Sequence, residues 1–154
     1  MFVTFGNKLT RATSESAGYD IHAPYDFTVE PGKVVTIKTG IRMVVPRGYY
    51  GKIYERSSVC LKKKCIVLAG VIDSDYRDEI IVILRNYSDD YIASFDKGDR
   101  FAQIILHKLF DGEHKHVNDE NELISNDSAC GSIDSTDSTD STIIRTGGFG
   151  STGK

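Results

Sequence analysis

Turn-forming residues interrupt the sequence between positions 25 and 109 about every eight to twelve residues, a spacing typical of all-β domains. Short segments rich in Val, Ile, Tyr and Phe lie between these turns, among them residues 33–39, 51–54, 80–84 and 101–110. None of them sustains the apolar period of about 3.6 residues that a long helix requires. The spacing therefore predicts an all-β fold, built as a sandwich, a jelly roll or a barrel.

One of these segments differs from the others in its composition. Residues 80–84 read Ile-Ile-Val-Ile-Leu and contain no polar side chain. A strand without polar alternation is typical of a position where both faces of the sheet are covered. We therefore expect these residues to form a central strand that is packed on two sides.

The bulk properties narrow the class of protein. The 154 residues fit one domain, and a formal net charge of -3 argues against general affinity for nucleic acid or acidic membranes. No apolar run is long enough to cross a bilayer, and residues 1–6 lack a cleavable leader, so we expect an intracellular protein, cytoplasmic or nuclear, without a targeting segment. The three cysteines, Cys60, Cys65 and Cys130, show neither disulfide nor zinc spacing.

The C-terminal third has too few apolar residues to form a core. Residues 1–110 are predicted to form the β core, and residues 111–144, with their repeated Ser, Thr and Asp, a flexible linker arm. Residues 145–154 combine Arg145, Phe149 and several glycines, which suits a clamp on a phosphorylated ligand. A disordered polar tail is the alternative.

Two short motifs contain residues suited to chemistry. Asp73 and Asp75, beside Tyr76, share a face if the chain stays extended, whereas a turn separates them. Asp73 is then either a general base in a pocket or part of an acidic surface turn. Arg56-Ser57-Ser58 is either a phosphate cradle or a solvated turn. Residues 62–64, three lysines, are interpreted as a solvated face.

Five blocks taken in order resemble the five motifs of the trimeric dUTPase family: residues 17–21, 56–58, 70–77, 98–103 and 145–153. The resemblance extends from about residue 12 to the end of the chain. It implies a jelly-roll-like β subunit in a homotrimer whose active sites are shared between subunits. It also implies that residues 145–154 close over the ligand of a neighbouring subunit.

The resemblance assigns roles to single residues. Asp73 matches the carboxylate that activates water, and Tyr76 the ring that packs under the deoxyribose. The uracil edge is read by the backbone of a hairpin, at Gly70, Val71, Ile72 and Ile81. The phosphates are held by Arg56, Ser57, Ser58, Gln103, Arg145, Ser151 and Thr152. Phe149, next to Gly150, matches the lid over uracil.

Three acidic residues have supporting roles in this comparison. Asp20 matches an acid near Mg²⁺, acting through water, while Asp99 is expected to brace Arg56 and Asp75 to support the loop. Glu55 precedes Arg56, and we expect that it can pair with Arg56 in competition with phosphate.

The implied function is Mg²⁺-dependent hydrolysis of dUTP to dUMP and pyrophosphate, by attack of water at the α-phosphorus. This reaction limits uracil incorporation into DNA and supplies dUMP for dTMP synthesis. A related deaminase needs a carboxylate inside the strand after the hairpin, and residues 80–84 have none. The alternative that stays open is a nucleotide-binding regulatory or interaction module in which hydrolysis is secondary.

Overall fold

The computed structural model describes residues 2–110, 112, 114–119, 121 and 122. Two compact units divide the chain, Met1–Gly112 and Glu113–Lys154, and all the elements named below lie in the first. No helix in the described ranges is long and apolar enough to span a bilayer.

Short strands dominate the first unit, as the turn spacing predicts. The elements follow one another as β1 (Val3–Gly6), β2 (Tyr19–His22), β3 (Phe27–Val29), β4 (Val34–Lys38), β5 (Ile41–Val44), β6 (Tyr49–Glu55), α1 (Ser57–Lys63), β7 (Cys65–Leu68), β8 (Val71–Ile72), β9 (Ile81–Asn86), β10 (Ala93–Phe95) and β11 (Arg100–Lys108).

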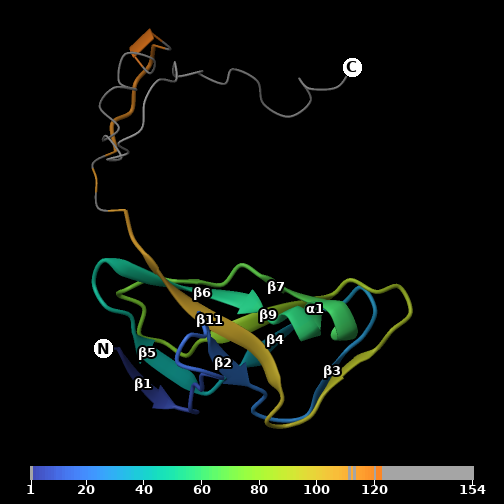
Figure 1. Ribbon diagram of the computed structural model, residues 1–154. Coiled ribbons are helices and arrows are strands. Elements are labelled where there is room, and N and C mark those ends of the chain that lie inside the picture. Colours follow the sequence, from blue (N-terminus) through green and yellow to red (C-terminus); the bar gives the residue numbers. More distant parts are fainter. Residues whose placement is uncertain (1, 111, 113, 120, 123–154) are drawn as a thin grey trace, which may run out of the picture. The chain divides into compact units, whose positions relative to one another are not determined.

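Two antiparallel sheets organise the unit. One has the strand order β2-β11-β6-β8 and the other β4-β9-β7, while β1 pairs with β5 and β3 with β10. The long strand β11 is central to the first sheet, because it pairs with β6 on one side and β2 on the other. Figure 1 shows β11 beside β2 and β6, with α1 following the end of β6. The all-β, jelly-roll-like fold is confirmed.

The inner faces of the sheets supply the apolar core. Ile53 and Ile104 come from the first sheet, and Val82 and Leu84 from the second, and each is at most 1% exposed. Fully burying an aliphatic side chain of this size stabilises the fold by about 1.5–3 kcal/mol. Aromatic packing extends the core toward β3 and β10, where the rings of Phe27 and Phe95 stack with centroids 4.7 Å apart.

The prediction for residues 80–84 is half correct. β9 is indeed the central strand of its sheet, between β4 and β7. Its two faces differ, however, because Val82 and Leu84 are fully buried while Ile81 is 41% exposed and Ile83 is half-buried. Successive side chains of a strand point to opposite faces, and within one chain only one face of this sheet is covered by the core.

The segment between β8 and β9 connects the two sheets and is not a regular hairpin. β8 pairs with β6, whereas β9 pairs with β4 and β7. A turn begins at Asp73, whose carbonyl accepts a hydrogen bond from the Tyr76 N–H at 3.2 Å. The expected hairpin is therefore replaced by a loop, and its turn keeps Asp73 and Asp75 from sharing a strand face.

Candidate functional site

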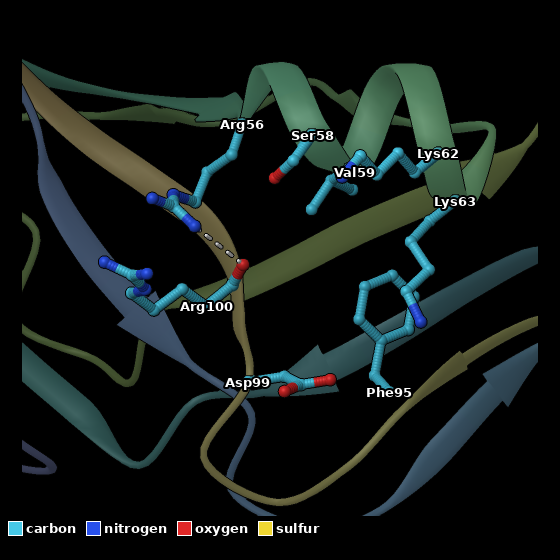
Figure 2. A pocket seen from close by; sticks show the side chains of 8 residues that line it. All are labelled: Arg56, Ser58, Val59, Lys62, Lys63, Phe95, Asp99 and Arg100. Carbon is cyan, nitrogen blue, oxygen red and sulfur yellow. Dashed lines mark hydrogen bonds between the residues drawn. The ribbon is translucent and has the colours of Figure 1, made fainter.

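A buried carboxylate links three segments that lie far apart in the sequence. Asp20 on β2 is only 5% exposed. Its Oδ1 lies 2.8 Å from the Arg56 Nε, and its Oδ2 lies 3.5 Å from the Arg100 Nη1. These contacts offset the cost of removing the carboxylate from water. They hold the guanidinium of Arg56 through Nε, and its Nη1 donates to the Arg100 carbonyl at 3.5 Å, the bond drawn in Figure 2.

This arrangement corrects the expectation for Arg56. The carboxylate paired with Arg56 belongs to Asp20 and not to Asp99, whose Oδ2 accepts a hydrogen bond from the Asp96 N–H at 3.1 Å. Glu55 also points elsewhere, since its Oε2 accepts from the Val67 N–H at 3.3 Å. Neither side chain is bonded to Arg56 in the structure, so neither competes with an anion there.

Gln103 lies beside this ion pair because β11 runs between β2 and β6. Its Cα is paired with that of Asp20 on one side and Tyr54 on the other, and its Nε2 donates to the Glu55 carbonyl at 3.1 Å. Gly18 makes room for it, since a Cβ at position 18 would lie 2.6 Å from the Gln103 Oε1. A cavity of about 250 Å³ opens here, lined by Ala12, Ser16, Ala17, Gly18, Asp20, Arg56 and Gln103.

A second cavity, of about 270 Å³, lies along α1. Figure 2 shows Ser58, Val59 and Lys63 reaching down from α1, and Phe95 of β10, Arg100 of β11 and the preceding turn residue Asp99 facing them. Arg56 and Lys62 complete its lining. Ser57 is exposed at the first helical residue, and α1 lacks a side-chain hydrogen bond at its N-cap. The first N–H groups of such a helix have no intrahelical acceptor.

The charge of the second cavity favours anions. Four of its lining residues are cationic and one, Asp99, is acidic. Arginine and lysine N–H groups form their strongest hydrogen bonds with carboxylate or phosphate oxygens. Because Arg56 lines both cavities, the two form neighbouring parts of one region whose cationic side chains suit an anion.

The segment 70–81 forms a separate group of predicted site residues. Gly70 has a φ of +90°, and a Cβ there would lie 3.1 Å from the Cβ of Ile53, so this close approach needs glycine. Val71 is 57% exposed, Ile72 is buried and Asp73 is exposed. Ile81, at the start of β9, pairs with Lys38 of β4.

Two hydrogen bonds shape the loop that follows Asp73. The hydroxyl of the half-buried Tyr76 donates to the Glu79 carbonyl at 2.9 Å. The Glu79 Oε1 in turn accepts from the Gly40 N–H at 2.7 Å, which ties the loop to the turn between β4 and β5. The orientation of the Tyr76 ring is thereby set by the chain itself.

The two groups lie at opposite ends of β6. Ile72 is paired with Gly51 near the start of that strand, whereas Arg56 follows its last residue. Asp73 and Arg56 are thus separated by six residue steps along a strand, or about 20 Å. One chain brings Arg56, Ser58 and Asp99 together, and Asp20 with Gln103, but it does not bring Asp73 to them. The predicted residues Arg145, Phe149, Gly150, Ser151 and Thr152 lie outside the described residues.

Sequence reasoning missed the contribution of Arg100, Lys62 and Lys63. Arg100 follows Gly98-Asp99, and its pairing with Asp20 joins residues eighty positions apart, which no local pattern reveals. The prediction of a solvated face holds for Lys62 and Lys64, which are exposed, but it does not anticipate that Lys62 and Lys63 line the second cavity. The available signal is that basic residues are favoured in the last turn of a helix, and Lys62 and Lys63 occupy the last turn of α1.

Cys65 lies next to this helix and behaves differently from an exposed thiol. Burial raises the pKa of Cys65 to about 11, partly opposed by the positive charge of Lys63. Its Sγ donates to the Lys63 carbonyl at 3.2 Å. The thiol is therefore protonated at neutral pH, the form that reacts poorly as a nucleophile.

Comparison with known proteins agrees with the motif pattern. A dUTPase family model matches residues 6–136. The chain is 41% identical over 144 residues to deoxyuridine 5'-triphosphate nucleotidohydrolase of Variola virus, covering 94% of this chain and 84% of that protein. It is 36% identical over 145 residues to the human mitochondrial enzyme of that name, covering 94% of this chain, and it spans half the length of that relative.

A solved structure shows the same fold. EIAV dUTPase superimposes with a TM-score of 0.70 at 28% identity, and the match covers 79% of this chain and 98% of that one.

Proposed function

Since the chain belongs to the dUTPase family, we propose that it hydrolyses dUTP to dUMP and pyrophosphate. The observation that carries this proposal is the cationic region around Arg56, where residues from three motifs meet beside two adjoining cavities. A triphosphate is the part of the substrate that such a region fits, because each phosphate accepts charge-assisted hydrogen bonds.

The active site is completed between subunits of a homotrimer. Asp73 lies about 20 Å from Arg56 along β6, too far for one water molecule to touch Asp73 and a phosphate held by Arg56 of the same chain. If a neighbouring chain supplies its Asp73 to the region around Arg56, the carboxylate and the bound phosphate can contact the same water molecule. The partly exposed Ile81 and Ile83 on the outer face of β9 also support assembly, since apolar side chains gain from burial.

The reaction begins with water activated by Asp73. The carboxylate accepts a proton from the water as its oxygen attacks the α-phosphorus, and pyrophosphate leaves on the opposite side. Arg56, Ser57, Ser58 and Gln103 of the facing chain hold the phosphates in position. Because Asp20 fixes Arg56 through Nε, the guanidinium needs little reorganisation when charge develops on the leaving group.

Selection of the base depends on the segment 70–81. Backbone groups of Gly70, Val71, Ile72 and Ile81 read the uracil edge, and the Tyr76 ring packs under the deoxyribose. A base that leaves one buried polar group unpaired costs about 1–3 kcal/mol of binding free energy. The hydrogen bond from the Tyr76 hydroxyl to the Glu79 carbonyl keeps the ring in one orientation, which makes its steric selection for deoxyribose stricter.

The donor set fits a Mg²⁺ ion that is bound mainly by the substrate. In the described ranges no group of three His, Cys, Asp or Glu side chains is arranged to hold a metal, so a dedicated protein cage is not indicated there. Mg²⁺ commonly keeps several waters and binds substrate phosphates with one or two carboxylates. Asp20 lines the first cavity and retains lone pairs beyond its two ion pairs, so it would hold a metal-bound water. The ion, when bound, neutralises charge on the triphosphate.

Residues 145–154 supply the closing motif. Arg145, Ser151 and Thr152 add donors to the terminal phosphate, and Phe149 beside Gly150 covers the uracil. Closure over the ligand expels bulk water and strengthens each electrostatic contact. In the cell the reaction limits uracil incorporation into DNA and supplies dUMP for dTMP synthesis.

Pyrophosphate release with dUTP, dCTP, dTTP and UTP tests the proposal. We expect turnover of dUTP to exceed that of the others, and Asp73→Asn to lose most turnover while binding a non-hydrolysable dUTP analogue within a few-fold. The matched control is Asp78→Asn, another exposed carboxylate of the same loop, which should stay active. Equal rates with all four nucleotides, or an active Asp73→Asn variant, would overturn the assignment.

The deaminase alternative is not supported by the structure of β9. Its inward side chains include the fully buried Val82 and Leu84, and no carboxylate lies in the strand. A nucleotide-binding module without hydrolysis would bind dUTP in the same assay and release no pyrophosphate.

A further inference from the structure

The cavity along α1 extends beyond the residues assigned to the triphosphate. Its far end is formed by Lys62 and Lys63, which belong to the last turn of the helix. We propose that this end binds pyrophosphate after cleavage and acts as an exit site for the leaving product. The inference rests on the proposed hydrolysis for the identity of its ligand, but the binding itself is independent of turnover.

Lys63 is held in place before any ligand arrives. Its Nζ donates to the Ser94 carbonyl at 2.6 Å and lies 5.4 Å from the centre of the Phe95 ring. An ammonium group has three donors, and this hydrogen bond uses one of them. A cation that is already ordered loses little side-chain entropy on binding an anion. Figure 2 shows Lys63 and the Phe95 ring side by side at this end of the cavity.

The charges around the cavity are not balanced by the protein. Arg56, Arg100, Lys62 and Lys63 line it, whereas Asp99 is the acidic residue of its lining and Asp20 pairs with both arginines from outside it. Among the residues that the structure describes, two positive charges thus remain without a carboxylate, in a chain whose formal net charge is -3. A ligand carrying at least two negative charges removes the repulsion between them. The apolar side chains of Val59 and Phe95 exclude water on one side, which strengthens the attraction.

The position of Arg56 connects this end to the reaction. Arg56 lines the first cavity with Asp20 and Gln103 and also lines the cavity along α1. Pyrophosphate that separates from dUMP therefore stays in contact with one guanidinium while it moves toward the two lysines. In the described part of the chain no hydrogen bond or ion pair occupies the Lys62 Nζ.

Calorimetric titration of pyrophosphate into the full-length protein tests the inference. We expect the double variant Lys62→Gln, Lys63→Gln to raise the Kd for pyrophosphate at least tenfold, or about 1.4 kcal/mol. The matched control is Lys64→Gln, which removes the same charge from the next residue without altering the lining of the cavity. The control Kd should stay within about twofold of the wild-type value, and product inhibition should weaken in parallel with binding.

Three outcomes would overturn the inference. An unchanged Kd in a double variant that keeps the wild-type Tm would show that the lysines do not bind pyrophosphate. Equal binding of inorganic phosphate and pyrophosphate would show general anion attraction. A rise in the KM for dUTP as large as the rise in the Kd for pyrophosphate would show that the lysines hold the substrate instead of the product. Lys63→Arg keeps the charge and should retain most of the affinity, which separates loss of charge from misfolding.

The test separates this inference from the proposed function. Lysine-dependent binding of pyrophosphate by a protein that does not hydrolyse dUTP would support the anion site and reject the hydrolase. Hydrolysis of dUTP by a protein whose binding of pyrophosphate does not depend on the lysines would support the hydrolase and reject the anion site.

Discussion

The ion pair between Asp20 and Arg56 offers a sharp test of how the phosphate region is built. Asp20→Asn keeps the side-chain volume and one acceptor oxygen but removes the negative charge between Arg56 and Arg100. Asp20 is 5% exposed, so little solvent replaces the lost interaction on its side. The arginine side chains are 24% and 47% exposed, so water satisfies part of their hydrogen bonding after the change.

These exposures set the size of the effect. Breaking a fully buried ion pair costs about 3–5 kcal/mol, and a hydrogen bond to a charged group contributes about 1.5–3 kcal/mol. For a pair that is buried on one side only, we expect the free energy of unfolding to fall by about 2 kcal/mol. In a core of this size that loss lowers the Tm by roughly 8 °C. Arg56 also loses its fixed orientation, so the KM for dUTP should rise about tenfold.

Thermal unfolding followed by circular dichroism measures the first effect, at constant protein concentration because assembly shifts the Tm. Asp78→Asn, at an exposed position, is the control and should change the Tm by less than about 2 °C. A Tm for Asp20→Asn equal to that of the control would refute the reasoning, since the ion pair would then contribute nothing to the fold.

Three further predictions follow from single contacts. Gly18→Ala places a Cβ against Gln103 and should lower kcat/KM about tenfold with a modest loss of Tm, as measured by steady-state kinetics and calorimetry. Glu79→Ala releases the loop after Asp73 from Gly40 and should lower kcat several-fold, whereas Glu79→Gln keeps the acceptor and should not. At pH 8 Cys65 should be alkylated about a hundredfold more slowly in the folded protein than in the denatured protein, because burial raises its pKa from 9.0 to about 11, and only a rise toward pH 11 should accelerate the reaction. Peptide mass spectrometry with a denatured control tests this.

The strands were predictable because their signals are local. Turn residues and short β-branched segments located β4, β6, β9 and β11 within a few positions of their observed ends. The pairing of strands was not predictable, since register depends on contacts between residues far apart in the chain. The resemblance assigned Asp99 as the acid that braces Arg56, whereas the pairing of β2 with β11 beside β6 brings Asp20 to Arg56.

The outer face of β9 shows a second limit of sequence reasoning. Its unbroken apolar run predicted cover on both faces, but a single chain covers only one of them. An unbroken apolar run does not distinguish a second layer that comes from the same chain from one that comes from a neighbouring subunit. The family resemblance predicts a hairpin across residues 70–81, whereas the two strands of this segment, β8 and β9, pair in different sheets.

Subunit mixing tests the central claim, that each site combines Asp73 of one chain with Arg56 of another. Asp73→Asn and Arg56→Gln should each be inactive alone. When equal amounts are unfolded together and refolded, about a quarter of the sites in random trimers receive both intact residues from different chains, so about a quarter of wild-type turnover should return. Mixed trimers without activity would contradict the account, because they would show that both residues must come from the same chain.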